Sequence, residues 1–134
     1  MVAGAKATQP EKTRRDLRWV GDSKAALQGF PEEVRYTIGT AIRWAQEGGK
    51  HPSAKPLAGF GDAQVLEISD NYDTDTFRAV YTVRFKDAIY VLHAFQKKSK
   101  KGTATPKQEI ELVRKRLTWA KKISAQSLEG MVKS

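Results

Sequence analysis

The sequence predicts an α+β domain in which helices pack on one face of a twisted antiparallel sheet. Apolar residues recur at helical spacing in residues 31–45 and again in residues 106–123. Between these segments, residues 77–96 alternate apolar and polar side chains, which is the pattern of strands. Because helical segments flank the strands along the chain, we expect helices to cover one face and leave the other open to a partner.

The N-terminal half is predicted to contain a short strand followed by two helices. Residues 1–15 are polar and lack periodicity, so they are predicted to form a flexible arm. A strand over residues 16–20 follows, and Ser23 is placed to cap a short first helix. Pro31 suits the first turn of the second helix, which two acidic residues favour further through the helix dipole.

The C-terminal half is predicted to form three antiparallel strands and a last helix. Residues 49–61 are rich in proline and glycine and are predicted to be a loop. The segments predicted next are a strand (65–69), an acidic turn (70–75), a strand (77–85), a tight turn (86–87) and a strand (88–96). Thr105 begins the last helix, with Pro106 at its first position. We therefore expect one domain over residues 16–124, followed by a tail over residues 125–134.

The composition limits the possible chemistry. A net charge of +9 favours a polyanionic partner, although a basic surface can also serve solubility alone. The absence of cysteine excludes disulfides, thiol nucleophiles and cysteine-based metal sites. The chain has two histidines, His51 and His93, and no nucleotide-binding or zinc-protease motif, so we expect no metal and no cofactor. Without a secretion signal or an apolar run near the roughly 20 residues that span a bilayer, a soluble cytoplasmic protein is expected.

Strand pairing across the predicted turn at residues 86–87 places useful side chains together. In this register Val80 pairs with His93 and Arg78 with Phe95, and paired residues share a face. The open face is then predicted to hold Arg78, Val80, His93 and Phe95, with Arg84 further along. The opposite face is predicted to lie under the helices and to hold Ala79, Tyr81, Val83, Tyr90, Leu92 and Ala94.

An arginine, a histidine and an aromatic ring on one open face suit a nucleotide. Arg78 can fork onto a phosphate, His93 can transfer a proton near neutral pH, and Phe95 can stack on a base. Each alone has a simpler interpretation, as a solvated charge, a core histidine or a core aromatic residue. Their coincidence on one face is what favours a functional site.

Lysines fringe this predicted face. Lys97, Lys98, Lys100 and Lys101 directly follow the last strand and precede a helix whose first N–H groups also attract anions. Lys55 adds a cation from the loop before the sheet. A lysine run can also be a solvated loop, but its position beside the predicted face favours contact with phosphates.

Five segments carry a resemblance to a known family. They are Phe30-Pro31-Glu32-Glu33-Val34-Arg35, Lys55-Pro56-Leu57-Ala58-Gly59-Phe60, Phe77-Arg78-Ala79-Val80-Tyr81, His93-Ala94-Phe95-Gln96-Lys97-Lys98-Ser99-Lys100-Lys101, and Thr105-Pro106 with the helix that follows. Together they resemble the phage-derived, HigB-type branch of the RelE/ParE toxin superfamily, over residues 16–123. The resemblance implies a RelE-like fold and a toxin that cuts mRNA on the ribosome without metal or cofactor.

The resemblance also implies roles for particular residues. In the family reaction a ribose 2′-hydroxyl attacks the adjacent phosphate. Arg78 matches the arginine that contacts this phosphate, and Lys97 or Lys98 matches the basic residue after the last strand. We predict catalysis by Arg78, His93 and Lys98, where His93 as proton carrier follows from the strand pairing. The predicted RNA contacts are Lys55, Arg84, Phe95, Lys97, Lys100 and Lys101.

The sequence departs from the family in one strand and in the last helix. Glu67 stands where RelE-type enzymes place basic residues, and the last helix has no tyrosine. Glu67 is either a base or a surface residue, and we favour the surface role. Two other functions remain open: a ParE-like gyrase inhibitor without catalysis, and a phage-derived module that binds nucleic acid or protein. The expected partners are mRNA on the ribosome, with contacts to rRNA, and a cognate helix-turn-helix antitoxin.

Overall fold

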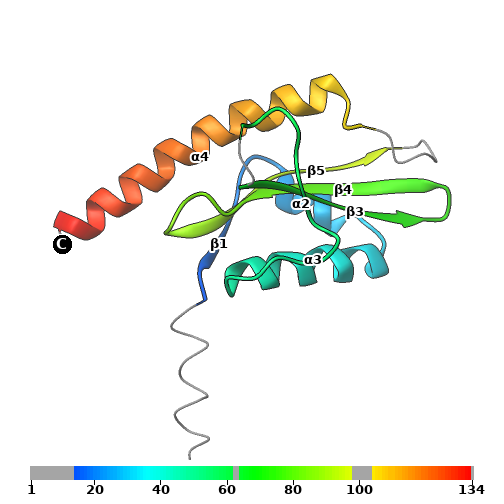
Figure 1. The fold of residues 1–134 in the computed structure, drawn as a ribbon, viewed down its shortest axis with the longest axis horizontal. Helices are drawn as coiled ribbons and strands as arrows, with labels where there is room; N and C mark the ends of the chain where they lie inside the picture. The colour runs from blue at the N-terminus through cyan, green and yellow to red at the C-terminus, as the bar shows by residue number, and fades with distance from the viewer. Residues whose placement is uncertain (1–13, 62–63, 98–103, 134) are drawn as a thin grey trace, which may run out of the picture.

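A computed structural model describes residues 14–61, 64–97 and 104–133 of the chain. Its elements are, in chain order, β1 (Asp16–Trp19), α2 (Ser23–Gln28), α3 (Glu32–Gln46), β2 (Lys55–Pro56), β3 (Val65–Tyr72), β4 (Asp75–Thr82), β5 (Ala88–Lys97) and α4 (Lys107–Lys133). The strands form one sheet in the order β1-β5-β4-β3-β2, in which only β1 and β5 are parallel neighbours. The predicted α+β class is confirmed (Figure 1).

Helices cover both faces of the sheet. α2 and α3 lie on one side and α4 lies on the other (Figure 1). Ile38, Tyr81 and Val91 belong to the buried cluster on the first side. Tyr90 and Val113 belong to a second buried cluster beneath α4. The prediction that all helices share one face is therefore wrong, because β4 and β5 are apolar on both sides and such strands need cover on both faces.

A β-bulge in β5 determines which side chains face α4. Val80 pairs with His93, whereas the next residue, Tyr81, pairs with Val91, so that Leu92 is an extra residue in the ladder. A bulge of this kind turns two successive side chains toward the same side of the sheet. Leu92 accordingly packs in the cluster beneath α4, and His93 contacts residues of α4.

The bulge also limits how far the predicted register holds. On one side of it, Arg78 pairs with Phe95 as predicted. On the other side Thr82 pairs with Tyr90, one residue away from its predicted partner. A shift of one residue moves side chains to the opposite face. Tyr90 and Leu92 therefore lie beneath α4, and their predicted place on the other face is wrong.

The connections between strands differ from those predicted. β3 and β4 extend into the acidic segment 70–75 until only Asp73 and Thr74 separate them, with Asp73 at a φ of 58°. β4 ends at Thr82, so residues 83–87 make the next connection. Within the predicted loop over residues 49–61, a two-residue strand, β2, pairs with β3.

Neither predicted helix cap forms. Ser23 lies inside α2 and donates its hydroxyl to the carbonyl of Val91 at 3.0 Å. Thr105 donates its hydroxyl to Glu67 on β3. The first hydrogen bonds of α4 are accepted by the carbonyl of Pro106, at 3.0 and 3.1 Å. Both hydroxyls thus join the helices to the sheet instead of closing a helix end.

α4 is longer than its apolar pattern predicts. The helix runs to Lys133 and so includes most of residues 125–134, which were predicted to be a tail. Its last turns project beyond the end of the sheet (Figure 1). Asp87, whose side chain is 4% exposed, holds α4 to the sheet by accepting hydrogen bonds from Ser124 at 2.6 Å and Tyr90 at 2.7 Å.

Tyr81 and Tyr90 offer a matched test of the packing on the two faces. The Tyr81 hydroxyl is buried and has no hydrogen-bond partner within the described part of the chain. Tyr81→Phe should raise the free energy of unfolding by about 1 kcal/mol, because it removes an unsatisfied buried group. Tyr90→Phe should lower it by about 2 kcal/mol, because Asp87 loses a donor. Urea denaturation measures both, and a Tyr81→Phe variant less stable than Tyr90→Phe would contradict this account.

Burial of Tyr81 also predicts a loss of stability at alkaline pH. Burial raises the pKa of Tyr81 from its ordinary value of 10.0 to about 12. The unfolded chain therefore releases this proton at a lower pH than the folded protein does. The contribution to stability is complete below a pH of about 10 and falls as pH rises toward 12. Thermal unfolding over this range should show a shallower decline for Tyr81→Phe, and parallel curves would disprove the assignment.

Candidate functional site

Polar side chains replace the apolar core at one end of the face that α4 covers. Arg78 on β4 lies opposite Ser69 on β3, and Glu67 on β3 lies opposite Lys55 on β2. Strand alternation places all four on the same face as Val80, which packs in the cluster beneath α4. Three neighbouring strands therefore bring an arginine, a carboxylate and a lysine to one region.

Arg78 is a buried cation held by polar partners. Its side chain is 4% exposed, and its Nη1 lies 3.5 Å from Oε2 of Glu67. The same Nη1 donates a hydrogen bond to Oγ1 of Thr105 at 3.0 Å, and Thr105 in turn donates to Glu67. A buried guanidinium is costly unless it is paired. Glu67 and Thr105 are thus what allows Arg78 to lie against the sheet.

A pocket of about 460 Å³ opens beside Arg78. Its walls come from β2, β3, β4 and the residues just before α4. The polar side chains in its lining are Ser53, Lys55, Glu67, Ser69, Asn71, Thr76, Arg78 and Thr105. Lys55 is exposed and Glu67 is 18% exposed, so the pocket is accessible to solvent. One guanidinium, one ammonium group and several hydroxyls face a single carboxylate, a balance that suits an anion.

His93 lies on the same face, but its ring is held between β5 and α4. Its Nε2 lies 2.6 Å from Oε1 of Glu109, and its Nδ1 lies 3.4 Å from Nη1 of Arg116. A guanidinium can only donate, so Nδ1 accepts and Nε2 carries the proton that is directed at Glu109. The ring also stacks on Phe95, with centroids 4.9 Å apart. Both ring nitrogens are therefore engaged in docking α4.

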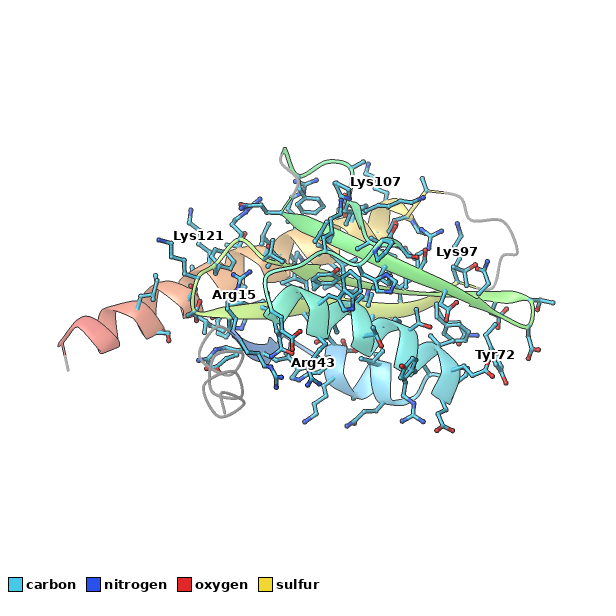
Figure 2. All side chains as sticks on the ribbon, turned by 60° about the horizontal axis from the view of Figure 1, so that its bottom comes forward. Arg15, Arg43, Tyr72, Lys97, Lys107 and Lys121 are labelled. Carbon is cyan, nitrogen blue, oxygen red and sulfur yellow. The ribbon has the colours of Figure 1, made fainter. Side chains whose placement is uncertain are left out.

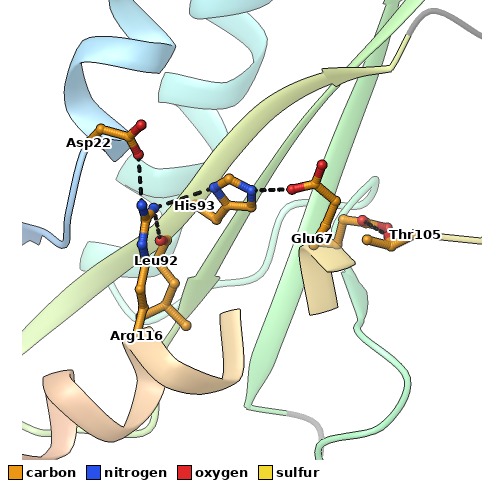
Figure 3. A network of polar contacts seen from close by, with 7 residues as sticks. Asp22, Glu67, Leu92, His93, Thr105 and Arg116 are labelled. Atoms are coloured by element: carbon orange, nitrogen blue, oxygen red, sulfur yellow. Dashed lines mark hydrogen bonds and ion pairs between the residues drawn. The ribbon is translucent and has the colours of Figure 1, made fainter. Parts of the chain in front are cut away.

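Arg116 extends this network to the N-terminal part of the chain (Figure 3). It donates to the carbonyl of Leu92 and to Oδ1 of Asp22, each at 2.9 Å. The hydrogen bond from Arg116, together with its charge, lowers the pKa of the Asp22 carboxyl. Gly21 has a φ of +60°, and a Cβ there would lie 2.6 Å from the guanidinium carbon. Glycine thus allows the backbone to pass close to Arg116.

The predicted site residues fall into groups. Arg78 and Lys55 line one pocket. His93 and Phe95 lie on the same face as Arg78, as predicted, but they are not part of the pocket lining. The prediction that this face is open is wrong, because the apolar stripe of α4 packs on the apolar residues farther along the same face. The role of His93 as proton carrier stays a prediction.

The other predicted residues lie at the margins of the site or outside the described residues. Lys97, at the end of β5, donates to the carbonyl of Ala104 at 3.4 Å. Arg84 follows the end of β4 and does not line the pocket. Three predicted residues, Lys98, Lys100 and Lys101, fall outside the residues that the structure describes. Their contacts with RNA stay predictions.

Thr105 and Glu67 are two residues whose place in the pocket the sequence analysis did not predict. Thr105 was assigned to a helix cap, and Glu67 was interpreted as a surface residue. A signal was present in β3, where Glu67, Ser69 and Asn71 are polar at alternate positions. Such an alternation predicts a polar stretch on one face of a strand. Thr105 had no comparable signal, because its contact joins segments 38 residues apart.

The described residues contain neither a metal-binding cluster nor a membrane-spanning helix. Within the ranges 14–61, 64–97 and 104–133, no cluster of three or more histidine, aspartate or glutamate side chains is placed to hold a metal ion. No helix in those ranges is both long and apolar enough to cross a membrane. The pocket offers a cation pair and a carboxylate, which can bind a phosphate and accept a proton.

Comparison with known proteins identifies a family. The model of the family described as phage derived protein Gp49-like (DUF891) matches residues 25–118. This range begins in α2, ends in α4 and contains the whole described pocket lining. No curated protein matches the chain.

The network around His93 predicts a structural effect of its removal. His93→Ala should lower the free energy of unfolding by about 3 kcal/mol, because Glu109 and Arg116 lose a buried partner. Glu109→Gln should cost about 1 kcal/mol, since the amide oxygen can still accept from Nε2. Urea denaturation measures both, with Glu111→Gln, on an exposed position of the same helix, as the control. Wild-type stability for His93→Ala would show that the network does not dock α4.

Proposed function

The chain belongs to the phage-derived Gp49-like family, which is related to RelE and HigB toxins, and we propose that it is the toxin of a type II toxin–antitoxin pair. In this proposal it belongs to the HigB-type branch and cuts mRNA on the ribosome. The observation that carries the proposal is the pocket in which Arg78 lies beside Glu67 and Lys55. An anion-binding pocket with an adjacent carboxylate provides the groups that cleavage of RNA requires.

Arg78 is the proposed phosphate-binding residue. Its guanidinium can form two parallel hydrogen bonds to phosphate oxygens. It is now paired with Glu67 at 3.5 Å, so an incoming phosphate competes with that carboxylate. The exchange replaces one anion by another, which keeps the buried cation neutralised. The same exchange releases Glu67 from Arg78 at the moment when the substrate is bound.

The proposed reaction is an attack of a ribose 2′-oxygen on the adjacent phosphorus. The new bond joins the 2′-oxygen to phosphorus and the bond from phosphorus to the 5′-oxygen breaks, leaving a cyclic phosphate and a 5′-hydroxyl. Glu67 accepts the proton of the 2′-hydroxyl, and Arg78 stabilises the added negative charge. Lys55 also lines the pocket and is exposed, and we assign it the role of donating a proton to the leaving 5′-oxygen.

A second candidate function is binding without catalysis, as in ParE-like gyrase inhibitors. It is favoured by the complete engagement of His93 in contacts with Glu109 and Arg116. A protein that acts by binding needs no proton carrier on this face. In both cases we expect a helix-turn-helix antitoxin as partner, encoded beside the toxin.

The pocket predicts which variants lose toxicity. On induced expression, the wild type should arrest growth and produce new mRNA ends at ribosome-occupied codons, and co-expression of the neighbouring gene should relieve both. Arg78→Gln should reduce cleavage by about 100-fold, because a donor to the transition state is lost. Arg78→Lys should restore only part of it, because lysine lacks the planar fork.

The controls separate the two candidate functions. Lys50→Gln, which removes an exposed charge outside the pocket, should cleave like the wild type. Circular dichroism confirms that each variant is folded. Growth arrest with damaged DNA and unchanged mRNA ends would indicate gyrase inhibition, and cleavage that persists in folded Arg78→Gln would refute the assignment of the pocket.

A further inference from the structure

The exposed side of α4 carries a second basic surface, separate from the pocket. Two adjacent rows run along it, with residues spaced by four and then three positions, as neighbours on a helix surface are. One row is Lys115, Trp119 and Lys122, and the other is Arg114, Thr118 and Lys121. All six are exposed, whereas Val113, Leu117 and Ala120 on the opposite side of the helix are buried against the sheet. We call these six residues the α4 surface.

The three lysines of the α4 surface are available to a ligand, whereas Arg114 donates to the carbonyl of Gly59 at 3.1 Å and lies over the ring of Phe60. Lys115, Lys121 and Lys122 form no ion pair with any residue in the described part of the chain. From residue 112 to residue 128 the helix carries no acidic residue. Figure 2 shows Lys121 projecting away from the body of the protein. Four cations along about two and a half turns of helix create a positive potential that attracts a chain of phosphates.

Trp119 distinguishes this surface from an ordinary solvated helix face. Trp119 follows Lys115 by four positions and precedes Lys122 by three, so it lies between them on the helix surface. The residue is 56% exposed. Lys115 and Lys122 are about 10 Å apart along the helix axis, given a rise of about 1.5 Å per residue. An unpaired base can stack on an exposed indole while the phosphates on either side of it contact the two lysines.

We infer that the α4 surface binds a single-stranded segment of RNA, with phosphates on Lys115, Lys121 and Lys122 and a base stacked on Trp119. The choice of RNA over another polyanion rests on the proposed function, whereas the surface itself does not involve the pocket. A single strand is favoured over a duplex because stacking on Trp119 needs a base that is not already stacked between its neighbours.

The composition of the α4 surface argues against a membrane as its partner. A helix that lies in a membrane interface inserts an apolar face. Here the apolar stripe of α4 is used against the sheet, and Trp119 is the one large apolar side chain among the six residues of the surface. The platform is also firmly held, because Arg116 and Ser124 join the same helix to Asp22 and Asp87. A rigid helix presents its lysines without a further cost of ordering the backbone.

The test measures binding of a labelled, unstructured RNA oligonucleotide by fluorescence anisotropy at several salt concentrations. Lys115→Gln/Lys122→Gln should weaken binding by at least about 10-fold at low salt. It should also reduce the slope of log affinity against log salt by about 1.4, that is, about 0.7 for each lost phosphate contact. Trp119→Ala should weaken binding by about 10-fold without changing the slope, because stacking releases no counterions.

Lys24→Gln/Lys50→Gln is the matched control, because it removes the same charge from exposed positions on and near the helices of the other face. It should change affinity by less than about twofold. A labelled DNA duplex is measured in parallel. The inference would be overturned if both α4 variants bound the RNA with wild-type affinity, or if they weakened binding of the duplex and not of the RNA. Either result would count even if growth arrest persisted. Loss of RNA binding in the α4 variants would support the inference even if the wild-type protein caused no growth arrest. The RNA site on the α4 surface and the proposed toxin function can therefore be tested separately.

Discussion

The position of α4 over a sheet with two apolar faces is the constraint on which the other features depend. The bulge at Leu92 turns His93 toward α4, where its two ring nitrogens form hydrogen bonds with Glu109 and Arg116. The same docking brings Thr105 to the sheet, where it completes the partners of a buried arginine and closes one wall of the pocket. The outward side of α4 is left exposed with its cations. One packing event therefore creates the pocket wall and the basic surface together.

We propose a functional role for the ion pair between Arg78 and Glu67, because stability alone does not explain it. A buried ion pair contributes little net stability, because desolvation offsets the attraction between the charges. Apolar side chains at these two positions would extend the core that already lies beneath α4. Because the pair lines an accessible pocket, exchange of Glu67 for an external anion would give this buried pair a role, and this is the role we propose. The proposed chemistry uses that exchange to bind phosphate and to release a carboxylate in one step.

Much of the fold follows from local patterns, but the site depends on contacts that local patterns do not encode. The helical stripes and the alternation in the strands predicted the class, the order of elements and the pairing of Arg78 with Phe95. The bulge at Leu92 has no sequence signal, since neither glycine nor proline marks it. β5 carries apolar residues on both of its faces, and this pattern is itself a signal that both faces are covered. Thr105 meets Glu67 only after the sheet and α4 have come together, so no local pattern predicts the contact.

The central claim is that Arg78 holds the phosphate of an RNA strand in the pocket between β2, β3 and β4. The most direct measurement is an NMR titration of the folded protein with a dinucleotide whose attacking 2′-hydroxyl is replaced by hydrogen, so that it binds without being cut. The account predicts saturable shifts of the Arg78 side-chain Nε–H signal and of the Thr105 amide, with the His93 ring signals almost unchanged. Shifts confined to His93, or to residues outside the pocket, would contradict it.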